Sequence, residues 1–328
     1  MARIHELRLI ARVAQMYHVE QLRQADIARH LRLSQASVSR ILKRAQDEGI
    51  VRTSIAAPTG TYGELEQGLR ERFDLPEAIV VECTEDRDGA IMARIGEAAA
   101  HFIEMTLQPG EVVGISSWSE TILKMVDNIY PMKAGRAKYV VQTLGGMGNP
   151  SVQTHATQLT TRLANLIGAE PRLLTAHGVA QSREAKLVML SDPYVRETID
   201  LFGKITLAIV GIGAIEPSRM LAGSGNVFSE GELSELKEAG AVGDISLRFF
   251  DRQGRTVKTP LDDRVIGMDM EALSQVDRAI GLAGGKAKTE AVAGALKAGV
   301  LSVLITDKFT AARLLGRESE FSEEAEVA

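Results

Sequence analysis

From about residue 78 onward, the chain alternates short apolar runs with amphipathic stretches of helical periodicity. Short β-rich runs that alternate with helices are typical of a parallel sheet with helices on both faces. The sequence therefore predicts an α/β fold built on a doubly wound, mostly parallel sheet. The expected strands are 78–81, 112–115, 139–144, 205–210, 278–283 and 301–305. The expected helices are 88–107, 120–128, 152–167, 182–190, 194–201, 230–238 and 288–297.

The first 55 residues have a different pattern, which predicts three helices. Apolar residues at helical spacing predict a helix over about 3–18, a short helix over 24–31 and a third from Gln35 to about Glu48. A short second helix, a tight polar turn and a basic third helix form a helix-turn-helix, whose last helix enters the major groove of DNA. An alternating stretch over 50–55 would add a β wing. The residues expected to contact DNA are Ser34, Gln35, Ala36, Ser37, Ser39, Arg40, Lys43 and Arg44.

The charge of the chain is divided unevenly between this segment and the rest. Residues 1–55 contain ten Lys and Arg against five Asp and Glu, a net charge of +5, which leaves −10 on the remainder. Such an asymmetry suggests a polyanion as partner of the basic segment alone. Arg40, Lys43 and Arg44 can reach phosphates or guanine, and short polar groups at the start of the helix can approach base edges. A generic three-helix bundle with a charged face is the alternative.

Helix-breaking residues at Pro58 and Gly60 predict a domain boundary. We expect a helix-turn-helix domain over 1–56, and a linker with a packing helix over 57–77. An effector-binding and oligomerisation domain is expected over 78–316, followed by an acidic, solvated tail over 317–328.

Cysteine usage and hydropathy indicate a cytoplasmic protein. Cys83 is the single cysteine, which excludes an intrachain disulfide and a cysteine metal cluster and fits a reducing compartment. No apolar run approaches the length of a membrane span, and the start of the chain does not resemble a signal peptide. No Walker A, HExxH or G-x-S-x-G motif is present, so we predict no catalytic residue, metal or cofactor.

Glycines and polar residues collect where the predicted strands end, which is where ligands bind in such sheets. In the loop 116–121, hydroxyls and N–H groups at a helix start could bind a phosphate or sugar hydroxyls, although the charge of Glu120 opposes a phosphate. The alternative is a capped helix start with an aromatic packing residue. Glycines at 145 and 146 allow close backbone approach. The residues expected to bind the ligand are Ser116, Trp118, Ser119, Glu120, Thr121, Gly145, Gly146, His177, Asp244 and Lys288.

For several of these residues a structural role is an open alternative. His177 could be a structural histidine, Asp244 a cap and Lys288 a solvated cation. The Gly-Ile-Gly run at 211–213 lacks the third glycine of a dinucleotide fingerprint, which argues against a nicotinamide site. Residues 249–254 are expected to form a hairpin turn.

Several runs, in this order and spacing, resemble the SorC family of bacterial sugar-sensing transcription regulators over essentially the full length of the chain. They are the helix-turn-helix over 24–49, Val113-Gly114-Ile115-Ser116, Leu144-Gly145-Gly146, Val210-Gly211-Ile212-Gly213-Ala214, Gly240-Ala241-Val242-Gly243-Asp244-Ile245, Ala283-Gly284-Gly285 and Leu304-Ile305-Thr306-Asp307.

The resemblance implies a larger domain with the fold of sugar-phosphate isomerases and glucosamine-phosphate deaminases that senses a sugar, polyol or sugar phosphate. It implies dimers or tetramers that control a carbohydrate or polyol catabolic operon, often as a repressor of a palindromic operator. It maps the effector pocket onto 116–121, Gly145, Gly146, Asp244 and Lys288. Ser119 and Glu120 depart from the family's more frequent Ser-Trp-Gly loop, which favours a neutral polyol or sugar.

Two other function classes compete with this interpretation. An isomerase- or deaminase-like enzyme of the same fold is the runner-up, but the Asp-Gly-His run of the deaminase branch is replaced here by Ala214-Ile215-Glu216-Pro217. A purely architectural DNA-binding protein would leave the large α/β domain with its polar strand ends unexplained.

Overall fold

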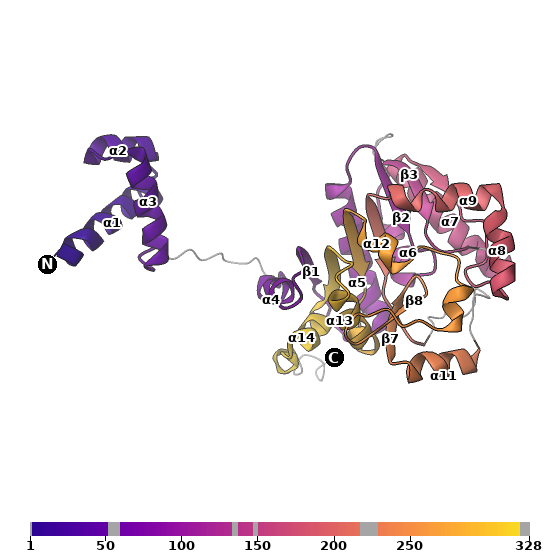
Figure 1. Ribbon diagram of the computed structural model, residues 1–328. Helices are drawn as coiled ribbons and strands as arrows, with labels where there is room; N and C mark the ends of the chain where they lie inside the picture. The colour runs from indigo at the N-terminus through magenta and orange to yellow at the C-terminus, as the bar shows by residue number, and fades with distance from the viewer. Residues whose placement is uncertain (1, 52–59, 133–136, 147–149, 217–228, 322–328) are drawn as a thin grey trace. The chain divides into compact units, whose positions relative to one another are not determined.

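The computed structural model describes residues 2–51, 60–132, 137–146, 150–216 and 229–321 (Figure 1). Contacts within the chain divide it into two compact units, Met1–Pro58 and Thr59–Ala328. No helix in the described ranges is both long and apolar enough to cross a membrane.

The smaller unit consists of three helices, α1 (Ala2–His18), α2 (Gln24–Leu31) and α3 (Gln35–Asp47). Arg32, in the left-handed conformation at φ 55°, ends α2, and the hydroxyl of Ser34 caps α3 by accepting from the Ser37 N–H at 3.1 Å. Apolar side chains from all three helices form the core, namely Ile10, Val13, Ala14, Met16, Ile27, Ala28, Val38, Leu42 and Ala45. The three predicted helices are thus confirmed.

The predicted wing lies mostly outside the described residues. Of the strand expected over 50–55, only Ile50 and Val51 are described, and they form a bend. The N–H of Val51 donates to the carbonyl of Ala45 at 2.9 Å, and its side chain packs beside α1 and α3.

The larger unit is built on a seven-stranded sheet in which every neighbouring pair is parallel. Its strand order is β1-β10-β9-β5-β2-β3-β4. The strands are β1 (Glu77–Val81), β2 (Glu111–Ile115), β3 (Ala137–Gln142), β4 (Glu170–Arg172), β5 (Leu207–Gly211), β9 (Arg278–Leu282) and β10 (Val303–Asp307). Parallel neighbouring strands require crossover connections, and here most of these connections contain helices.

Helices cover both faces of this sheet, which produces two hydrophobic cores. One core lies under α4 (Gly63–Phe73), α8 (Arg183–Ser191), α9 (Pro193–Ile199), α13 (Thr289–Lys297) and α14 (Lys308–Leu315). The other lies under α5 (Asp88–Thr106), α6 (Glu120–Asn128) and α7 (Pro150–Ile167). The predicted doubly wound α/β class is confirmed.

A small antiparallel sheet sits beside the main one. It contains β6 (Gly213–Ala214), β7 (Ala241–Ile245) and β8 (Arg248–Asp251), with α11 (Glu230–Glu238) before β7. The chain reverses between β7 and β8 at Ser246 and Leu247, which both have positive φ. The turn predicted over 249–254 is a second reversal, in which the Gly254 N–H donates to the carbonyl of Asp251 at 2.9 Å.

Several elements differ from the prediction. The third strand lies at 137–142 instead of 139–144, because 143–146 already leave the sheet as a loop. The three-residue β4 and the short helix α12 (Met270–Ser274) are too brief to show a period in the sequence. The helix α14 was not predicted because it is buried on nearly all sides and therefore lacks a polar stripe.

Candidate functional site

The residues predicted to contact DNA lie on α3 and at its cap. All eight are exposed except the half-buried Ser37. The hydroxyls of Ser34 and Ser37 lie 2.8 Å apart and hydrogen-bond to each other in the cap of α3. The remaining six form the solvent-facing side of α3, which is the side that a helix-turn-helix presents to the major groove.

The three cations on this helix differ in their surroundings. Arg44 is bridged to Glu48 at 2.7 Å and to Glu6 of α1, and these carboxylates raise its pKa. Arg40 donates to the carbonyl of Ala36 at 3.4 Å, within its own helix. Lys43 forms no ion pair with any described residue. A DNA phosphate would therefore meet Lys43 directly, whereas Arg44 would have to exchange two carboxylates for it.

A cavity of about 570 Å³ opens at the carboxyl ends of the parallel strands. From β2 the chain runs outward to β3 and β4, and from β5 it runs the other way to β9 and β10. The order of the strands thus reverses between β2 and β5, which is the topological switch point where doubly wound sheets bind ligands. Seven of the ten predicted effector residues line this cavity, namely Ser116, Trp118, Ser119, Glu120, Thr121, Asp244 and Lys288.

The first wall of the cavity is the loop between β2 and α6. Ser119 is the N-cap of α6 and accepts from the Ile122 N–H at 3.3 Å. The buried Trp118 donates its indole N–H to the carbonyl of Gly145 at 3.1 Å and packs with Leu144, Leu247 and other apolar side chains. Thr121 is 2% exposed and also lines the cavity. The capped helix start and the aromatic packing residue, which were the alternative to a ligand site, are therefore both present in the wall of the cavity.

The small antiparallel sheet supplies Asp244 to the opposite wall. The Asp244 carboxylate is buried and accepts from the Leu247 N–H at 2.8 Å across the β7–β8 reversal. Burial raises the pKa of Asp244 to about 6, against the hydrogen bond from Leu247 and the charge of Lys288. A Cβ on Gly213 would lie 2.1 Å from the Asp244 carboxylate, so a larger residue at that position of β6 would displace this side chain.

Lys288, the N-cap residue of α13, lines the cavity just after the Gly284-Gly285 pair that follows β9. Its ammonium has no hydrogen-bond or ion-pair partner among the described residues. Burial lowers the pKa of Lys288, and the charges of Asp244, Asp88 and Glu120 oppose that shift. The helix dipole also disfavours a cation at a helix N-terminus, so the three carboxylates oppose both effects.

Gly145, Gly146 and His177 are not among the residues that line the cavity. A Cβ on Gly145 would lie 2.4 Å from the carbonyl oxygen of His177, and one on Gly146 would lie 2.1 Å from the Gln142 amide nitrogen. The backbones of Gly145 and His177 are thus in close contact, and Trp118 is hydrogen-bonded to this pair through the Gly145 carbonyl. An effector contact for these three residues stays a prediction.

The loop after β1 also contributes to the cavity, although the sequence did not predict it. Arg87, Asp88, Gly89 and Met92 line the cavity, as do the hairpin residues Ser246 and Leu247. All parallel strands end at the same edge, so the polar start of α5 was the available signal. Asp88 with Glu120 and Asp244 makes three carboxylates in the lining, against the two cations Arg87 and Lys288.

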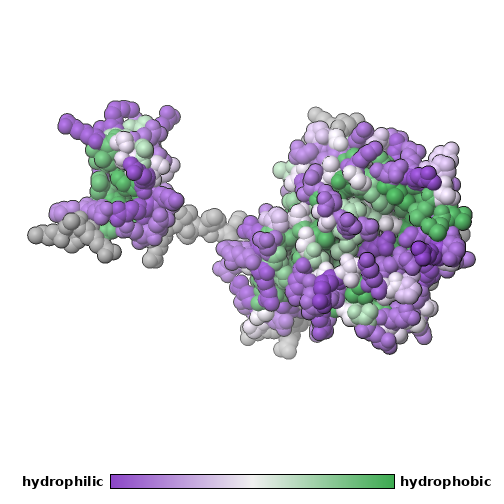
Figure 2. Space-filling view, in the orientation of Figure 1, coloured by the Kyte–Doolittle hydropathy of each residue, from purple (hydrophilic) through white to green (hydrophobic). Residues whose placement is uncertain are grey.

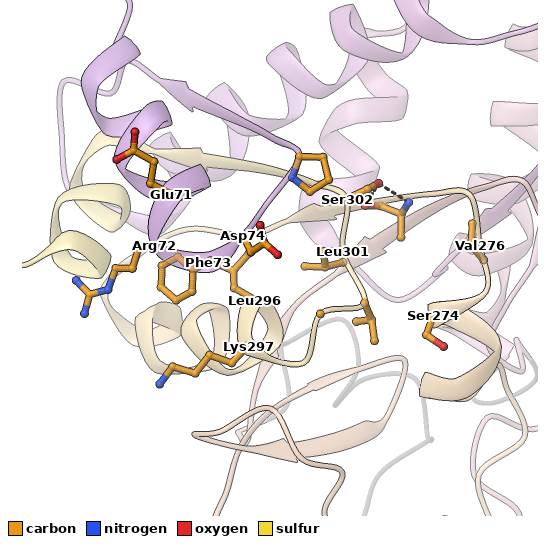
Figure 3. Close-up of a pocket in the computed structure, with 14 residues that line it drawn as sticks. Glu71, Arg72, Phe73, Asp74, Ser274, Val276, Leu296, Lys297, Leu301 and Ser302 are labelled. Atoms are coloured by element: carbon orange, nitrogen blue, oxygen red, sulfur yellow. Dashed lines mark hydrogen bonds between the residues drawn. The ribbon is translucent and has the colours of Figure 1, made fainter. Parts of the chain in front are cut away.

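A second cavity, of about 710 Å³, lies at the opposite, amino-terminal edge of the sheet (Figure 3). It is bounded by the ends of α4 and α13, with Phe73 and Leu296 in its wall and Ser302 bonded to Ala279 behind them. None of the predicted effector residues lines it. Although it is larger, it lies at the end of the strands where doubly wound sheets do not bind ligands.

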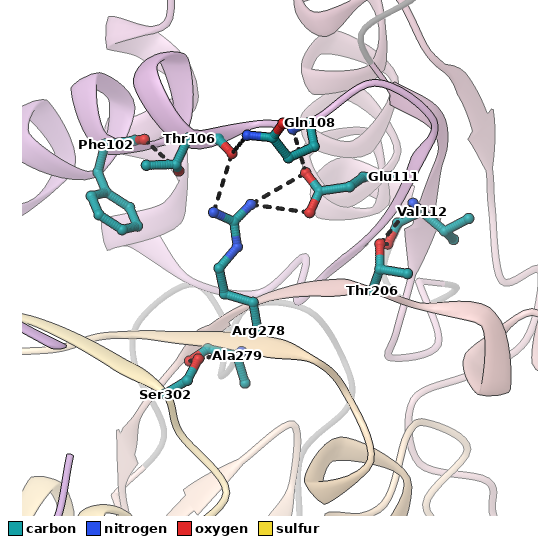
Figure 4. Close-up of polar contacts among 9 residues, drawn as sticks. All are labelled: Phe102, Thr106, Gln108, Glu111, Val112, Thr206, Arg278, Ala279 and Ser302. Atoms are coloured by element: carbon teal, nitrogen blue, oxygen red, sulfur yellow. Dashed lines mark hydrogen bonds and ion pairs between the residues drawn. The ribbon is translucent and has the colours of Figure 1, made fainter. Parts of the chain in front are cut away.

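The same amino-terminal edge is closed by an ion pair. Arg278, at the start of β9, reaches across to Glu111 of β2 at 3.1 Å and to the carbonyl of Thr106 at 3.2 Å (Figure 4). Thr206 accepts from the Val112 N–H at 3.2 Å beside them. These groups satisfy one another and hold the strands together at this edge.

Comparison with known proteins decides the family. A model described as "Putative sugar-binding domain" matches residues 58–316, and one described as "MarR family" matches residues 6–59. The chain belongs to the SorC family of sugar-binding transcription regulators. The predicted family and the DNA-binding, sugar-binding regulator function are thereby confirmed.

The relatives of this SorC-family chain are regulators. It is 30% identical to the deoxyribonucleoside regulator of Bacillus subtilis, over 92% of this chain and 95% of that protein. It is 31% identical to the transcriptional regulator LsrR of Escherichia coli K12, over 93% and 94%. The crystal structure of the full-length sorbitol operon regulator SorC from Klebsiella pneumoniae matches with a TM-score of 0.71 and 28% identity, over 94% of this chain and 98% of that one.

A solved sugar-binding domain is also similar. The structure of the sugar-binding domain of the transcriptional regulator DeoR from Pseudomonas syringae pv. tomato is 40% identical in sequence to this chain and matches it with a TM-score of 0.62. It covers 78% of this chain and the whole of that one. The similarity therefore extends over both the helix-turn-helix and the α/β unit.

Proposed function

We propose that this regulator represses a carbohydrate or polyol catabolic operon and leaves its operator when a sugar, polyol or sugar phosphate binds in the cavity at the β2–β5 switch point. The observation that carries the proposal is the convergence there of Thr121, Asp244 and Lys288, from three separate elements. Hydroxyls, a carboxylate and an ammonium in one cavity can donate to and accept from several sugar hydroxyls at once.

The charges of the lining favour a neutral polyol or sugar over a sugar phosphate. Glu120, Asp88 and Asp244 outnumber the two cations, and a phosphate would have to approach these carboxylates against their repulsion. Among the relatives, one is named for the sorbitol operon, which supports a polyol as effector class.

The regulator is proposed to bind DNA as a dimer or tetramer on a palindromic operator. A two-fold assembly places two copies of α3 in successive major grooves. The effector would act by binding one arrangement of subunits better than the other, which shifts the population away from the DNA-binding form.

The cavity is proposed to sense its ligand without converting it. The relatives are named as regulators, and the deaminase-type Asp-Gly-His run is absent from the sequence after β5. Incubation of the purified protein with sugars and sugar phosphates should give no product. Turnover of any of them would move the assignment to the isomerase- or deaminase-like alternative.

The direct test is a thermal-shift screen of the full chain against sugars, polyols and their phosphates, because a ligand that binds only the folded state raises the melting temperature. The shift should disappear in Thr121→Val and persist in Ser274→Ala, which lines the cavity at the other edge of the sheet. The stabilising compound should then release a labelled operator fragment. A shift that Thr121→Val leaves unchanged would place the effector elsewhere.

The Glu120→Gln variant tests the class of the ligand. Removing this charge should strengthen binding of a phosphorylated compound several-fold while it changes binding of the matching neutral sugar little. If the wild-type protein already binds the phosphate more tightly than the neutral sugar, the preference for a neutral effector is wrong.

A further inference from the structure

Two polar side chains at the carboxyl end of β10 are completely buried. Figure 2 shows hydrophilic residues, in purple, over much of the surface of the larger unit. In contrast, Asp307 at the end of β10 and Thr310 in the first turn of α14 are both 0% exposed. Neither residue lines the cavity at the switch point. Because a buried carboxylate is costly unless hydrogen bonds compensate it, the partners of Asp307 indicate what it holds in place.

The carboxylate of Asp307 accepts hydrogen bonds from two separate parts of the chain. Its Oδ1 caps α14 by accepting from the Thr310 N–H at 2.9 Å. Its Oδ2 accepts from the Thr310 hydroxyl at 2.6 Å and from the Gly285 N–H at 3.1 Å. The same Gly285 N–H lies 2.8 Å from Oγ1 of Thr310. The cap of α14 uses Oδ1 alone, so the other bonds join this helix start to the loop after β9.

The loop after β9 lies directly against Asp307 and has no room for side chains. A Cβ on Gly284, which lines the cavity, would lie 2.2 Å from Oδ2 of Asp307. A Cβ on Gly285 would lie 2.6 Å from Oδ1 of Asp88, another residue of the cavity wall. Gly285 also has a φ of 97°, which favours glycine. The backbone at 284–285 is therefore held between the buried carboxylate and the cavity.

Lys288 follows this loop by a single turn. The carbonyl of Gly285 accepts from the Lys288 N–H at 3.1 Å, and Lys286–Lys288 form a 3-10 helix. The fixed backbone of Gly285 thus sets the position of the Lys288 backbone. Because the Lys288 ammonium has no hydrogen-bond or ion-pair partner among the described residues, its place in the cavity depends on this backbone.

We propose that Asp307 and Thr310 are positioning residues of the effector site: through the Gly285 N–H they hold the turn from which Lys288 enters the cavity. Neither side chain contacts the ligand. A cation that is already held in place does not have to be ordered when the ligand binds, which favours affinity. This inference rests on the proposed function of the cavity and adds two supporting residues to it.

The test is the titration of the Lys288 amine in the full-length protein without any sugar. Trace acetylation with acetic anhydride over a series of pH values, followed by mass spectrometry, gives the pH at which Lys288 is half deprotonated. Burial lowers the pKa of Lys288 in the cavity, against the charges of Asp244, Asp88 and Glu120. A wild-type Lys288 that titrates at the ordinary lysine pKa of about 10.4 would overturn the proposal, because its amine would not be held in the cavity.

Thr310→Val removes the hydroxyl without changing any charge, so Gly285 retains only its longer contact to Asp307. We expect the pKa of Lys288 to rise by about 0.5 or more, because the released amine becomes hydrated. Thr310→Ser keeps the hydroxyl and should titrate like the wild type. Thr198→Val is the matched control, since the buried Thr198 of α9 donates to the carbonyl of Leu173 at 3.0 Å, away from the cavity. No change in Thr310→Val, or an equal change in Thr198→Val, would overturn the proposal.

Asp307→Asn separates positioning from a simple effect of charge. Asparagine keeps an oxygen for the cap of α14 but places its NH₂ group against the Gly285 N–H, donor against donor. Loss of a nearby negative charge would by itself lower the pKa of Lys288, whereas release of the turn raises it. A lowered or unchanged pKa in Asp307→Asn would contradict the positioning role of this carboxylate.

The outcomes separate this inference from the proposed function, because the acetylation needs no ligand. If Lys288 responds as expected but no sugar, polyol or phosphate stabilises the protein, the positioning of Lys288 stands and the proposed effector class is wrong. If a sugar binds but Lys288 is insensitive to both Thr310→Val and Asp307→Asn, the effector site stands and these two residues do not support it.

Discussion

Trp118 donates its indole N–H to the carbonyl oxygen of Gly145 at 3.1 Å, which ties the loop after β2 to the loop after β3. The indole is 5% exposed, and Trp118 is also part of the cavity wall. Since Gly145 in turn lies against the backbone of His177, this bond connects the cavity to the layer of close-packed backbone behind it.

The first prediction follows from Trp118 being the single tryptophan of the chain. An effector in the cavity displaces water beside the indole or moves the 116–121 loop, so its binding should change the wavelength or intensity of tryptophan emission. A fluorescence titration measures this, with Trp118→Phe as the control that shows the emission comes from this indole. A compound that raises the melting temperature but leaves the emission unchanged binds away from this wall.

The second prediction concerns the pH dependence of stability. Burial raises the pKa of Asp244 to about 6 in the folded protein, against about 3.9 in an unfolded chain. The charged carboxylate therefore destabilises the fold, a penalty that is absent below about pH 4, grows between about pH 4 and 6 and is complete above about pH 6. At pH 7 the Asp244→Asn protein should be more stable by at most about 3 kcal/mol. The attraction of the carboxylate to Lys288 is already included in this pKa.

Denaturant unfolding followed by Trp118 emission measures the Asp244 effect, because that signal comes from the larger unit alone. The difference in unfolding free energy between Asp244→Asn and the wild type should shrink as the pH falls from 7 to 4. A difference that does not change with pH would show that the Asp244 carboxylate does not titrate in this range in the folded protein.

The third prediction ranks the cations of α3 in DNA binding. Lys43→Ala and Arg40→Ala should weaken operator binding and each reduce the salt slope by about 1. Arg44→Ala should cost less, because Arg44 must first leave Glu6 and Glu48. Conversely, Glu6→Gln should tighten DNA binding by freeing Arg44 from one carboxylate. Fluorescence anisotropy at several salt concentrations measures all four, and an Arg40→Ala protein with unchanged affinity and slope would contradict the assignment of α3.

The fourth prediction separates packing from ligand contact at Gly145. An added Cβ would lie 2.4–2.6 Å from backbone atoms of His177 and Gly178, which cannot move as a side-chain end can. Gly145→Ala should therefore destabilise the fold by about 1–3 kcal/mol. Gly203→Ala is the control, since nothing lies within 4 Å of a Cβ built there. A stable Gly145→Ala protein that fails to bind the effector would instead assign this glycine to ligand contact.

Most of the fold follows from local patterns in the sequence. The periodicity of apolar residues predicted the helices 120–128 and 230–238 with the bounds that the structure shows. Such patterns are local because a helix or strand must place its apolar face on the core. The third strand was predicted two residues too far along the chain, because its apolar run continues into the following loop. The helix α14 was not predicted, because a helix buried on nearly all sides carries no clear period.

The candidate site was also predicted only in part from the sequence. Loops at strand ends were recognisable one by one, and seven of their residues meet in the cavity. The sequence could not show that the start of α5 joins them, because β1 lies at the far edge of the sheet in strand order. It also could not show that Gly145 serves backbone packing or that Glu6 and Glu48 hold Arg44.

By itself the sequence determined the two-part organisation, the α/β class, the helix-turn-helix and the family, because each depends on residue order and local spacing. Only the tertiary structure decided which polar groups face a shared cavity and which form helix caps and ion pairs. Three carboxylates and two cations come to one cavity from separate parts of the chain. Their proximity depends on the order of strands in the sheet, which no local pattern encodes.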